Sequence, residues 1–542
     1  MKRFNFFVSV AYAVSLDSIK MTSTLMKKYS YKTLIALVVF VSLFFASCNK
    51  QLDVSSTRQA SEEGHFTKYE DARAGLIGIY GLFRAAVANS NAHWVMGELR
   101  MGDFQAVSRP DLKAVVEGNL NASFPLINEV TNWRRFYAII NACNVFIERA
   151  EGCLADPRYT ESYYKLDIAQ ARALRAFAYY MLVRTWGDVP LVTGTGEGNF
   201  ENLPRTNKDA VLGFAKNELI DVANRLPYQY STVDPDLVYP PNYYGNSASD
   251  WKNTLLGRLS AYGILAHIAA LQGDYINVAV YTQFVLDNAI RARLTTVTTD
   301  QLVNELFLFN TSNVSWNQMI GFNFIYERGE STTSGHLEQL TLANTTVFPM
   351  SKQLPDIYVN KDTISVLFPR TNGNDQRFGF NPTNALPTEA YFENYSSAIP
   401  VFKKIRVING GSSTGNGSLA KYNSSIIFTR LEELTLLNAE ALAVLGRGEE
   451  AVQKLNSVRS NRGISGVNYT PDLDLIKEIF SERRRELLGE GWRWYDLVRY
   501  NKLRRSNTLF NELIDKGGIY WPIAQDVLNR NPNIKQNSYW TR

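Results

Sequence analysis

Residues 257–289 read "GRLSAYGILAHIAALQGDYINVAVYTQFVLDNA" and set the architecture of this chain. Small residues recur in it at helical spacing, and these are Ala261, Ala266, Ala270 and Ala279. Before the last of them comes Gly273-Asp274, a pair that is typical of a tight turn. Because small side chains allow two helices to approach closely, the stretch predicts a helical hairpin.

Three further stretches share this small-residue pattern, namely residues 68–87, 169–192 and 430–463. The last repeats the plan most closely, with the turn "LGRGE" between the alanines at 439, 441 and 443 and the alanine at 451. The pattern is typical of tetratricopeptide-like hairpins. Since one helix pair cannot bury its apolar face alone, the sequence predicts a mainly α-helical fold in which four hairpins form one bundle.

Two regions between these stretches have a different composition. Residues 228–251 and most of 310–425 are rich in Asn, Ser, Thr, Gly, Pro and aromatic residues. The second region shows only short β-like runs, such as the one at 364–369. We therefore expect long ordered loops in these two regions, and such loops on a rigid scaffold are where binding usually occurs.

The N-terminal part has the features of an export signal. From Met26 the chain has three lysines, about a dozen apolar residues and then "ASC", which ends at Cys48. "FASC" resembles a bacterial lipobox, which implies cleavage before Cys48 and lipidation of its thiol. We interpret residues 1–47 as an N-terminal extension plus a lipoprotein signal peptide, and the polar residues 48–65 as a tether.

A basic and aromatic block, "ERRRELLGEGWRWYDLVRYNKL" at residues 482–503, has the appearance of a nucleic-acid grip. From residue 477 to residue 499, however, six basic residues face five acidic ones at spacings of three or four. A phosphate-binding surface needs unopposed positive charge on one face. The block therefore predicts an internally neutralised helix and no nucleic-acid partner. The small net charge of +5 for the whole chain does not indicate any class of partner either.

Cysteine and histidine are too sparse for a metal site. The three cysteines do not make a disulfide framework or a four-ligand zinc site, and Cys143 and Cys153 are expected to be two buried thiols about 15 Å apart on a helix. The four histidines lie far apart with no HExxH motif, and no nucleotide fingerprint is present. We expect no metal and no cofactor.

Four segments together resemble the SusD/RagB family of Bacteroidetes outer-membrane lipoproteins. They are "RALRAFAYYMLVRTWGDVPLV" (172–192), "RLEELTLLNAEAL…LNSVRSNRGI" (430–464), "ERRRELLGEGWRWYDLVRY" (482–500) and "YWPIAQDVLNRNPNIKQNSYW" (520–540). The resemblance implies four tetratricopeptide-like units beside a looped C-terminal subdomain. It also implies an N-terminal SusD-like region at 66–230, a C-terminal SusD/RagB region at 231–542, and nutrient capture for a TonB-dependent transporter similar to SusC.

The resemblance also implies a structural role for the basic block. Its charged and aromatic residues are then expected to pair within the fold, and they are Arg483, Arg484, Glu486, Glu490, Arg493, Trp494 and Asp496. The localisation that it implies is the outer membrane, with a lipid anchor on Cys48 and the folded part facing the cell exterior.

A glycan hydrolase on a helical scaffold is the alternative of a different class. Glu98 and Asp103 in "ELRMGDF" offer two carboxylates, but the sequence does not place them across a cleft. "GSSTG" at 411–415 fits GxSxG, yet it lies in a glycine- and serine-rich run without the strand and helix of a nucleophile elbow. The prediction is a binding protein without enzymatic activity.

Aromatic side chains on loops are the candidates for ligand binding, because their faces stack on sugars or peptides. They are Trp94, Trp316, Phe322, Tyr326, Tyr243 and Tyr244, with Tyr239 in the same proline-rich loop as the last two. Trp94 and Trp316 are weighted highest, since their regions roughly correspond to ligand-contacting loops of related proteins. The expected ligand is an oligosaccharide or polysaccharide, and the alternative is a peptide or glycopeptide.

Overall fold

The computed structural model describes residues 66–541 apart from short gaps. The gaps are 197–200, 231–233, 235, 237–241, 247–250, 252–253, 311–316, 346–349, 373, 381–386 and 410–419. The predicted signal peptide, the tether, Cys48, Tyr239, Trp316 and the "GSSTG" run lie outside the described residues. Residues 66–542 form one compact unit, and the division predicted at 230/231 stays a prediction.

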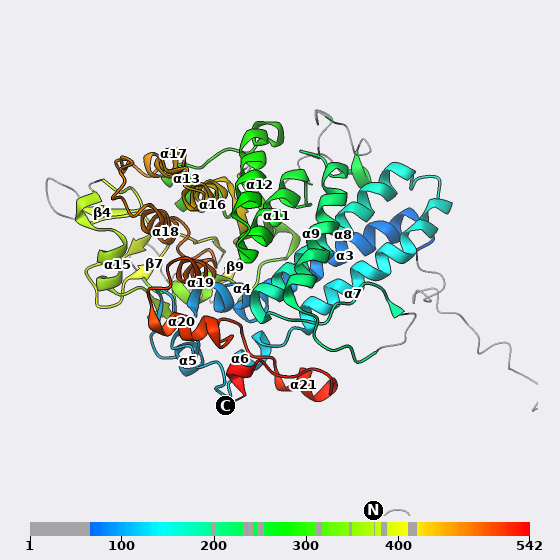
Figure 1. The fold of residues 1–542 in the computed structure, drawn as a ribbon, viewed down its shortest axis with the longest axis horizontal. Coiled ribbons are helices and arrows are strands. Elements are labelled where there is room, and N and C mark those ends of the chain that lie inside the picture. The colour runs from blue at the N-terminus through cyan, green and yellow to red at the C-terminus, as the bar shows by residue number, and fades with distance from the viewer. Residues whose placement is uncertain are drawn as a thin grey trace, which may run out of the picture. The chain divides into compact units, whose positions relative to one another are not determined.

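Four antiparallel helix pairs form the scaffold (Figure 1), which confirms the predicted mainly α-helical, tetratricopeptide-like class. The pairs are α3 (Tyr69–Ala88) with α7 (Arg134–Arg149), α8 (Glu161–Trp186) with α9 (Lys208–Val222), α11 (Arg258–Gln272) with α12 (Tyr275–Asn288), and α16 (Leu431–Val444) with α17 (Gly448–Ser460). Helix α8 touches α7, and α12 touches α16, so neighbouring pairs cover each other's apolar faces.

The α11–α12 hairpin forms as its sequence predicts. Gly273 ends α11 with φ 78°, a left-handed conformation that a side chain disfavours. Asp274 caps α12, where its carboxylate accepts a hydrogen bond from the Asn277 N–H at 3.2 Å. Ala266 and Ala279 are buried between the two helices and α16. Short side chains at these positions permit the close approach.

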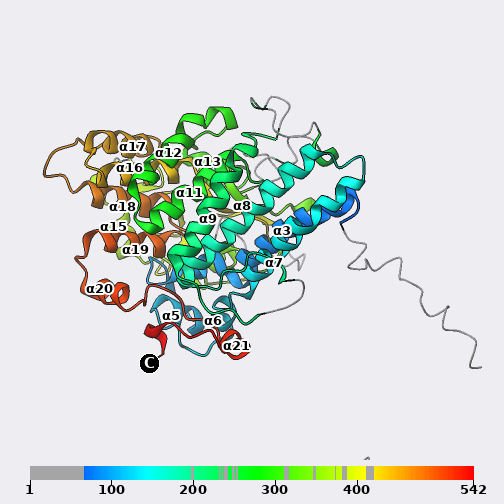
Figure 2. The same cartoon turned by 45° about the vertical axis from the view of Figure 1, so that its right-hand side comes forward.

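The first two stretches each supply one helix of a pair and not a whole hairpin. Residues 68–87 correspond to α3, whose partner α7 begins only at Arg134. Residues 169–192 contain most of the second half of α8, whose partner α9 begins at Lys208. Figure 2 shows α3, α7 and α8 running side by side. A local pattern identifies the helix but not a partner separated from it by a long loop.

Shorter helices complete the described part of the chain. They are α4 (Ala92–Trp94), the π-helix η3 (Val95–Leu99), α5 (Pro110–Val116), α6 (Pro125–Val130), α13 (Thr299–Val303), α14 (Leu337–Thr341), α15 (Lys361–Leu367), α18 (Leu475–Glu486), α19 (Arg493–Arg504), α20 (Thr508–Asp515) and α21 (Gln525–Arg530). The 3-10 turns that bear on the site are η7 (Tyr243–Gly245) and η9 (Tyr326–Arg328).

Five two-stranded antiparallel ladders account for the strands of the described residues. They are β1 (Gln105–Ala106) with β3 (Ile357–Tyr358), β2 (Gln318–Phe322) with β10 (Ile426–Arg430), β4 (Phe378–Phe380) with β5 (Pro387–Glu389), β6 (Phe392–Glu393) with β7 (Val401–Phe402), and β8 (Ile408–Asn409) with β9 (Lys421–Tyr422). Most of them lie between residues 318 and 430, the region that the sequence predicts to be loop-rich.

The β-like run predicted at 364–369 is wrong, because this segment belongs to helix α15. Asn360 caps the helix, where its side-chain oxygen accepts a hydrogen bond from the Thr363 N–H at 2.7 Å. Ile364 and Leu367 are both buried, and their spacing of three matches a helix. A short apolar run does not distinguish a strand from a helix, and here the capping residue Asn360 does.

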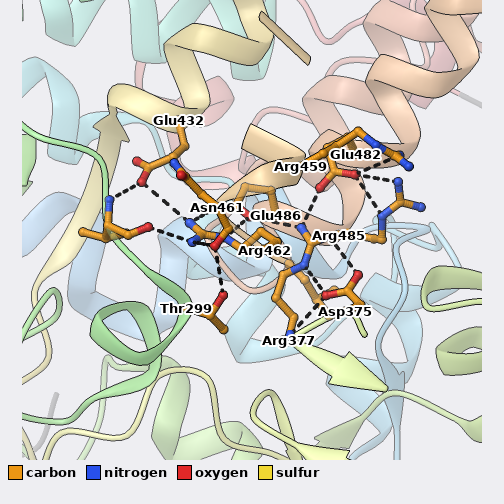
Figure 3. Close-up of polar contacts among 12 residues, drawn as sticks. Thr299, Asp375, Arg377, Glu432, Arg459, Asn461, Arg462, Glu482, Arg485 and Glu486 are labelled. Atoms are coloured by element: carbon orange, nitrogen blue, oxygen red, sulfur yellow. Dashed lines mark hydrogen bonds and ion pairs between the residues drawn. The ribbon is translucent and has the colours of Figure 1, made fainter. Parts of the chain in front are cut away.

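A buried network of arginines and carboxylates ties the C-terminal elements together (Figure 3). Glu486 on α18 pairs with Arg462 at 2.8 Å, with Arg430 at 2.9 Å and with Arg377 at 3.1 Å. Burial alone would raise the pKa of Glu486, but these guanidinium groups outweigh it and hold the pKa well below its usual value. One carboxylate thus joins α18 to the end of α17, to β10 and to the loop before β4.

The basic block is structural, as predicted, but it is not one helix, because α18 ends at Glu486 and α19 begins only at Arg493. Most of its ionic partners lie on other elements. Arg485–Glu482 and Arg499–Asp496 are ion pairs within one helix, at 2.7 and 2.9 Å. Arg483 instead reaches Glu433 on α16 at 2.9 Å. Charge spacing along one helix therefore indicates neutrality without naming the partners. The two cysteines at 143 and 153 are buried free thiols, as expected.

Candidate functional site

A hollow of about 610 Å³ lies beside α3, in the size range of ligand pockets. Three parts of the chain form it: the exposed side of α3, the end of β2 with the turn that follows, and the residues Asn246, Trp251 and Thr254. Helix α3 and Trp251 lie far apart in the chain. The hollow is therefore a product of the tertiary fold.

Helix α3 provides one wall through residues four and seven positions apart. Arg73, Ile77 and Arg84 line the hollow, while Leu76 and Phe83 on the other side of the helix are fully buried. Gly81 lies between them, and a Cβ atom there would meet no atom within 4 Å. The amphipathic period of the helix thus places a polar and aliphatic stripe in front of open space.

Aromatic residues form the floor. Phe322 of β2 stacks on Phe83 with ring centroids 5.0 Å apart and an interplanar angle of 14°. The Tyr80 hydroxyl donates a hydrogen bond to Gln170 Oε1 at 2.9 Å, and the Trp251 indole donates one to the Tyr243 carbonyl at 2.7 Å. Because their polar atoms are already bonded, these rings present apolar surface.

Charged groups form the rim. Arg84 pairs with Glu330 at 3.0 Å, and Glu70 pairs with Arg158 at 2.6 Å. Both carboxylates of the hollow are thereby neutralised by arginine. Arg73 and Arg328 have no carboxylate partner among the residues that the structure describes, and both are exposed. The rim therefore offers two guanidinium groups that are free to donate hydrogen bonds.

A buried carboxylate anchors the wall that contains Asn246 and Trp251. Asp167 on α8 accepts hydrogen bonds from the hydroxyls of Tyr243 and Tyr244, and from that of Tyr159 at 2.9 Å. Burial raises the pKa of Asp167 to about 7, although the three phenol donors act in the opposite direction. The turn η7, which precedes the hollow-lining segment, is therefore held to the helical scaffold.

Three of the six aromatic ligand candidates are corrected to core residues. The Trp94 indole donates a hydrogen bond to the Gly489 carbonyl at 3.1 Å and the side chain is 2% exposed. Tyr243 and Tyr244 are equally buried, because their hydroxyls serve Asp167. None of these rings has the free face that stacking on a ligand requires. Trp94, on α4, is thereby held to the loop between α18 and α19.

Two other candidates lie at the hollow. Phe322 lines it, although the ring is mostly buried against Phe83. Tyr326 is 44% exposed and lies between Ile325 and Arg328, which both line the hollow. Trp316 lies outside the described residues and stays a prediction. Phe322 thus lies where a ligand would have access, and its role in binding stays a prediction, as does that of Tyr326.

Glu98 and Asp103 do not form a catalytic pair. Glu98 is fully buried and accepts hydrogen bonds from the N–H groups of Gly489 and Gly491, both at 2.9 Å, while burial raises its pKa to about 7. Asp103 is enclosed by Arg484 and Arg493, with Nε–oxygen distances of 3.0 Å. Neither carboxylate lines the 610 Å³ hollow beside α3. Both are structural.

The sequence reasoning missed the residues of α3 and Trp251. The helical period of α3 could have indicated them. Arg73, Ile77 and Arg84 lie on the face opposite to the buried apolar residues, where solvent or a ligand must lie. No signal placed Trp251, because its position depends on the Asp167 anchor. Within the described residues, no group of His, Cys, Asp and Glu is arranged to hold a metal, and no helix is long and apolar enough to cross a membrane.

Comparison with known proteins gives consistent results for sequence and structure. Residues 369–512 match the family model described as the SusD family. The chain is 26% identical to SusD-like protein P38 of Formosa agariphila over 540 residues, which cover 94% of this chain and 99% of that protein.

Solved structures agree with this match. A SusD superfamily protein of Bacteroides thetaiotaomicron is 44% identical, and the alignment covers 88% of this chain and all of that one with a TM-score of 0.78. A structure described as a laminarin-binding SusD-like protein is 21% identical, with 87% of this chain and 99% of that one covered and a TM-score of 0.65, which shows the shared fold. On the 44% identity over the whole length of a SusD superfamily structure, this chain belongs to the SusD family.

Proposed function

We propose that this protein binds an oligosaccharide or polysaccharide at the cell surface and delivers it to a SusC-like TonB-dependent transporter, without catalysis. The observation that carries the proposal is the 610 Å³ hollow beside α3, with an aromatic floor and a polar rim. Membership of the SusD family supports the same conclusion. The laminarin-binding SusD-like protein, which shares the fold, supports a glycan as the ligand class.

The chemistry of the hollow suits a sugar. A pyranose ring has an apolar face that packs on aromatic surface, and Tyr80, Trp251 and Phe322, which are 9%, 6% and 7% exposed, supply a small area of such surface. Its hydroxyls need hydrogen-bond partners at the rim, where Arg73 and Arg328 offer several N–H donors each. A peptide is the alternative ligand, because the same groups bind an aromatic side chain and a carboxylate.

The carboxylates of the hollow support binding without hydrolysis. A glycosidase needs two carboxyl groups about 5 to 9.5 Å apart, one of them protonated at working pH. Arg158 pairs with Glu70 at 2.6 Å and its hydrogen bond lowers the pKa of that carboxyl group, whereas Glu330 is paired with Arg84 at 3.0 Å. Glu70 is therefore unsuited to donate a proton to a leaving glycoside oxygen, and both carboxylates of the hollow are already engaged by an arginine.

The test is calorimetric titration of the mature protein with a panel of laminarin, other oligosaccharides and a peptide mixture, combined with an assay for new reducing ends. We expect binding to one glycan class with no new reducing ends. Release of reducing ends by pure protein would support the hydrolase instead, and binding of peptides alone would support the alternative ligand.

Two variants locate the site. Arg73→Ala and Tyr326→Ala should each reduce the binding free energy of the glycan by about 1 to 3 kcal/mol. This is a loss of roughly five- to 150-fold in affinity, as for other anchors of a binding site. Both side chains are exposed, so the melting temperature should not change. Arg447→Ala, at an exposed turn outside the hollow, is the matched control and should bind like the unchanged protein. Unchanged affinity in both variants would place the site elsewhere.

A further inference from the structure

A second, smaller cavity lies inside the scaffold, among α8, α11, α19 and the segment Ile519–Tyr520. Its volume is about 40 Å³, which is enough for one or two water-sized bodies and too small for a sugar ring. None of its lining residues lines the 610 Å³ hollow. The cavity is therefore a separate feature from the proposed glycan site.

Two hydrogen-bond donors that line this cavity have no partner in the described structure. Arg184 of α8 is 5% exposed, and its buried Nε has no hydrogen-bond acceptor among the described residues. Tyr495 of α19 has a buried hydroxyl that also lacks a partner there. The two side chains are in contact, with the Arg184 guanidinium carbon 4.2 Å from the centre of the Tyr495 ring. Unsatisfied buried donors at one place call for an acceptor.

The charged residues around the cavity also favour a bound acceptor. Three cations line it, Arg184, Arg499 and Lys502, and of these only Arg499 has carboxylate partners among the described residues, Glu440 and Asp496, at 2.8 and 2.9 Å. Burial, reinforced by the charges of Lys208 and Arg499 and opposed by that of Asp209, lowers the pKa of Lys502. Uncompensated positive charge is costly in such a place.

The surrounding shell adds charges of both signs. Arg483 pairs with Glu433 and Asp496, while Lys208 and Asp209 act on Lys502 with opposite signs. His267, which also lines the cavity, has a pKa lowered by burial and adds no charge at neutral pH. Arg184 and Lys502 remain without an ion pair to a carboxylate among the described residues.

We propose that this cavity binds a small monovalent anion, chloride under physiological conditions, between α8 and α19. The Arg184 guanidinium, the Tyr495 hydroxyl and the Lys502 ammonium group would donate to it. A water molecule would satisfy the donors but not the charge, and the rings around Arg184, which include Tyr180, Phe428 and Trp492, offer only weak compensation. The bound anion would join α8, which belongs to one of the four helix pairs, to α19.

The first test measures thermal unfolding of the whole mature protein in sodium chloride and in sodium gluconate at equal ionic strength. Gluconate is too large for the cavity, so only chloride should raise the melting temperature, in a saturable way that follows ligand linkage. Equal melting temperatures in the two salts over the whole concentration range would overturn the proposal.

Variants assign the effect to the cavity. Tyr495→Phe removes a single hydroxyl and preserves the ring, so the protein should fold while the chloride midpoint weakens by about tenfold or more. Tyr500→Phe on the same helix, outside the cavity, is the matched control and should keep the midpoint. A midpoint that does not move in Tyr495→Phe would overturn the assignment even if chloride stabilises the protein.

Crystals grown in sodium bromide give an independent readout. Bromide should replace chloride and produce an anomalous peak within hydrogen-bond distance of Arg184 Nε and Tyr495 Oη. Water density at this position without an anomalous peak would overturn the proposal.

Discussion

Single buried side chains hold distant parts of this protein together, and Glu486 is the clearest case. Its carboxylate contacts three arginines that belong to three other parts of the chain. Removing one partner of a buried ion pair leaves the others unpaired in a low-dielectric environment, which costs far more than the pair itself contributes. The effect of a substitution should therefore be large and specific to this site.

Glu486→Gln should lower the free energy of unfolding by about 3 to 5 kcal/mol, because it leaves Arg377, Arg430 and Arg462 with insufficient negative charge. Urea denaturation followed by circular dichroism measures the change. Glu478→Gln on the same helix, where no ion pair is formed within the described residues, is the matched control. A loss below about 1 kcal/mol would show that the network is dispensable.

Asp167 makes stability depend on pH, since burial raises its pKa to about 7 in the folded state. In the unfolded chain the group titrates near 3.8. Between these values the folded state holds the proton more tightly, so this contribution to stability is complete below the unfolded pKa and is lost as pH rises through about 7.

Asp167→Asn removes this titration. The unfolding free energy of the variant, measured at pH 5 and pH 8, should fall less with rising pH than that of the unchanged protein, by at most about 1.4 kcal/mol per pH unit. Asp472→Asn, at an exposed position, should leave the slope as it was. Identical slopes for Asp167→Asn and the unchanged protein would show that Asp167 is ionised throughout this range.

At the scale of elements, small residues control how closely the hairpins pack. Ala441 of α16 is fully buried in the cluster shared with α11 and α12, whereas Ala443, two positions further, is half-buried at the edge of another cluster. A larger side chain at the first position has no room without moving a neighbouring helix. Substitutions at these two alanines of one helix can therefore be compared directly, one at a buried position and one at a half-buried position.

Ala441→Leu should destabilise the protein by about 1 to 3 kcal/mol through overpacking. Ala443→Leu should have an effect within about 0.5 kcal/mol, because its side chain can extend toward solvent. Thermal denaturation of both variants measures the difference. Equal melting temperatures would mean that the α12–α16 contact is loose enough to accept a leucine.

For the whole molecule, the proposed lipid anchor determines where the binding site works. Cys48→Ala should release the protein from the membrane fraction, since the polar tether has no other anchor without acyl chains. Fractionation in a strain that lacks the transporter measures this release. Retention of the variant in the outer membrane of that strain would remove lipidation from the proposal.

Much of the scaffold was determined by the sequence itself. The hairpins α11–α12 and α16–α17 follow from local patterns of small residues and turn glycines, because consecutive helices meet across a short turn. The neutral character of the basic block was also readable, since opposite charges alternate along it. Burial of Cys143 and Cys153 agreed with their apolar surroundings.

Only the tertiary structure decided which side chains meet across long loops. Trp94, Tyr243 and Tyr244 have the composition of a binding loop, yet carbonyl and carboxylate partners from distant segments draw them into the core. The hollow beside α3 combines residues from three regions of the chain, and the Arg184 cavity combines residues more than three hundred positions apart. Local patterns determine helices and turns, whereas contacts between remote segments depend on how those helices pack, and packing selects one arrangement from many that the same pattern allows.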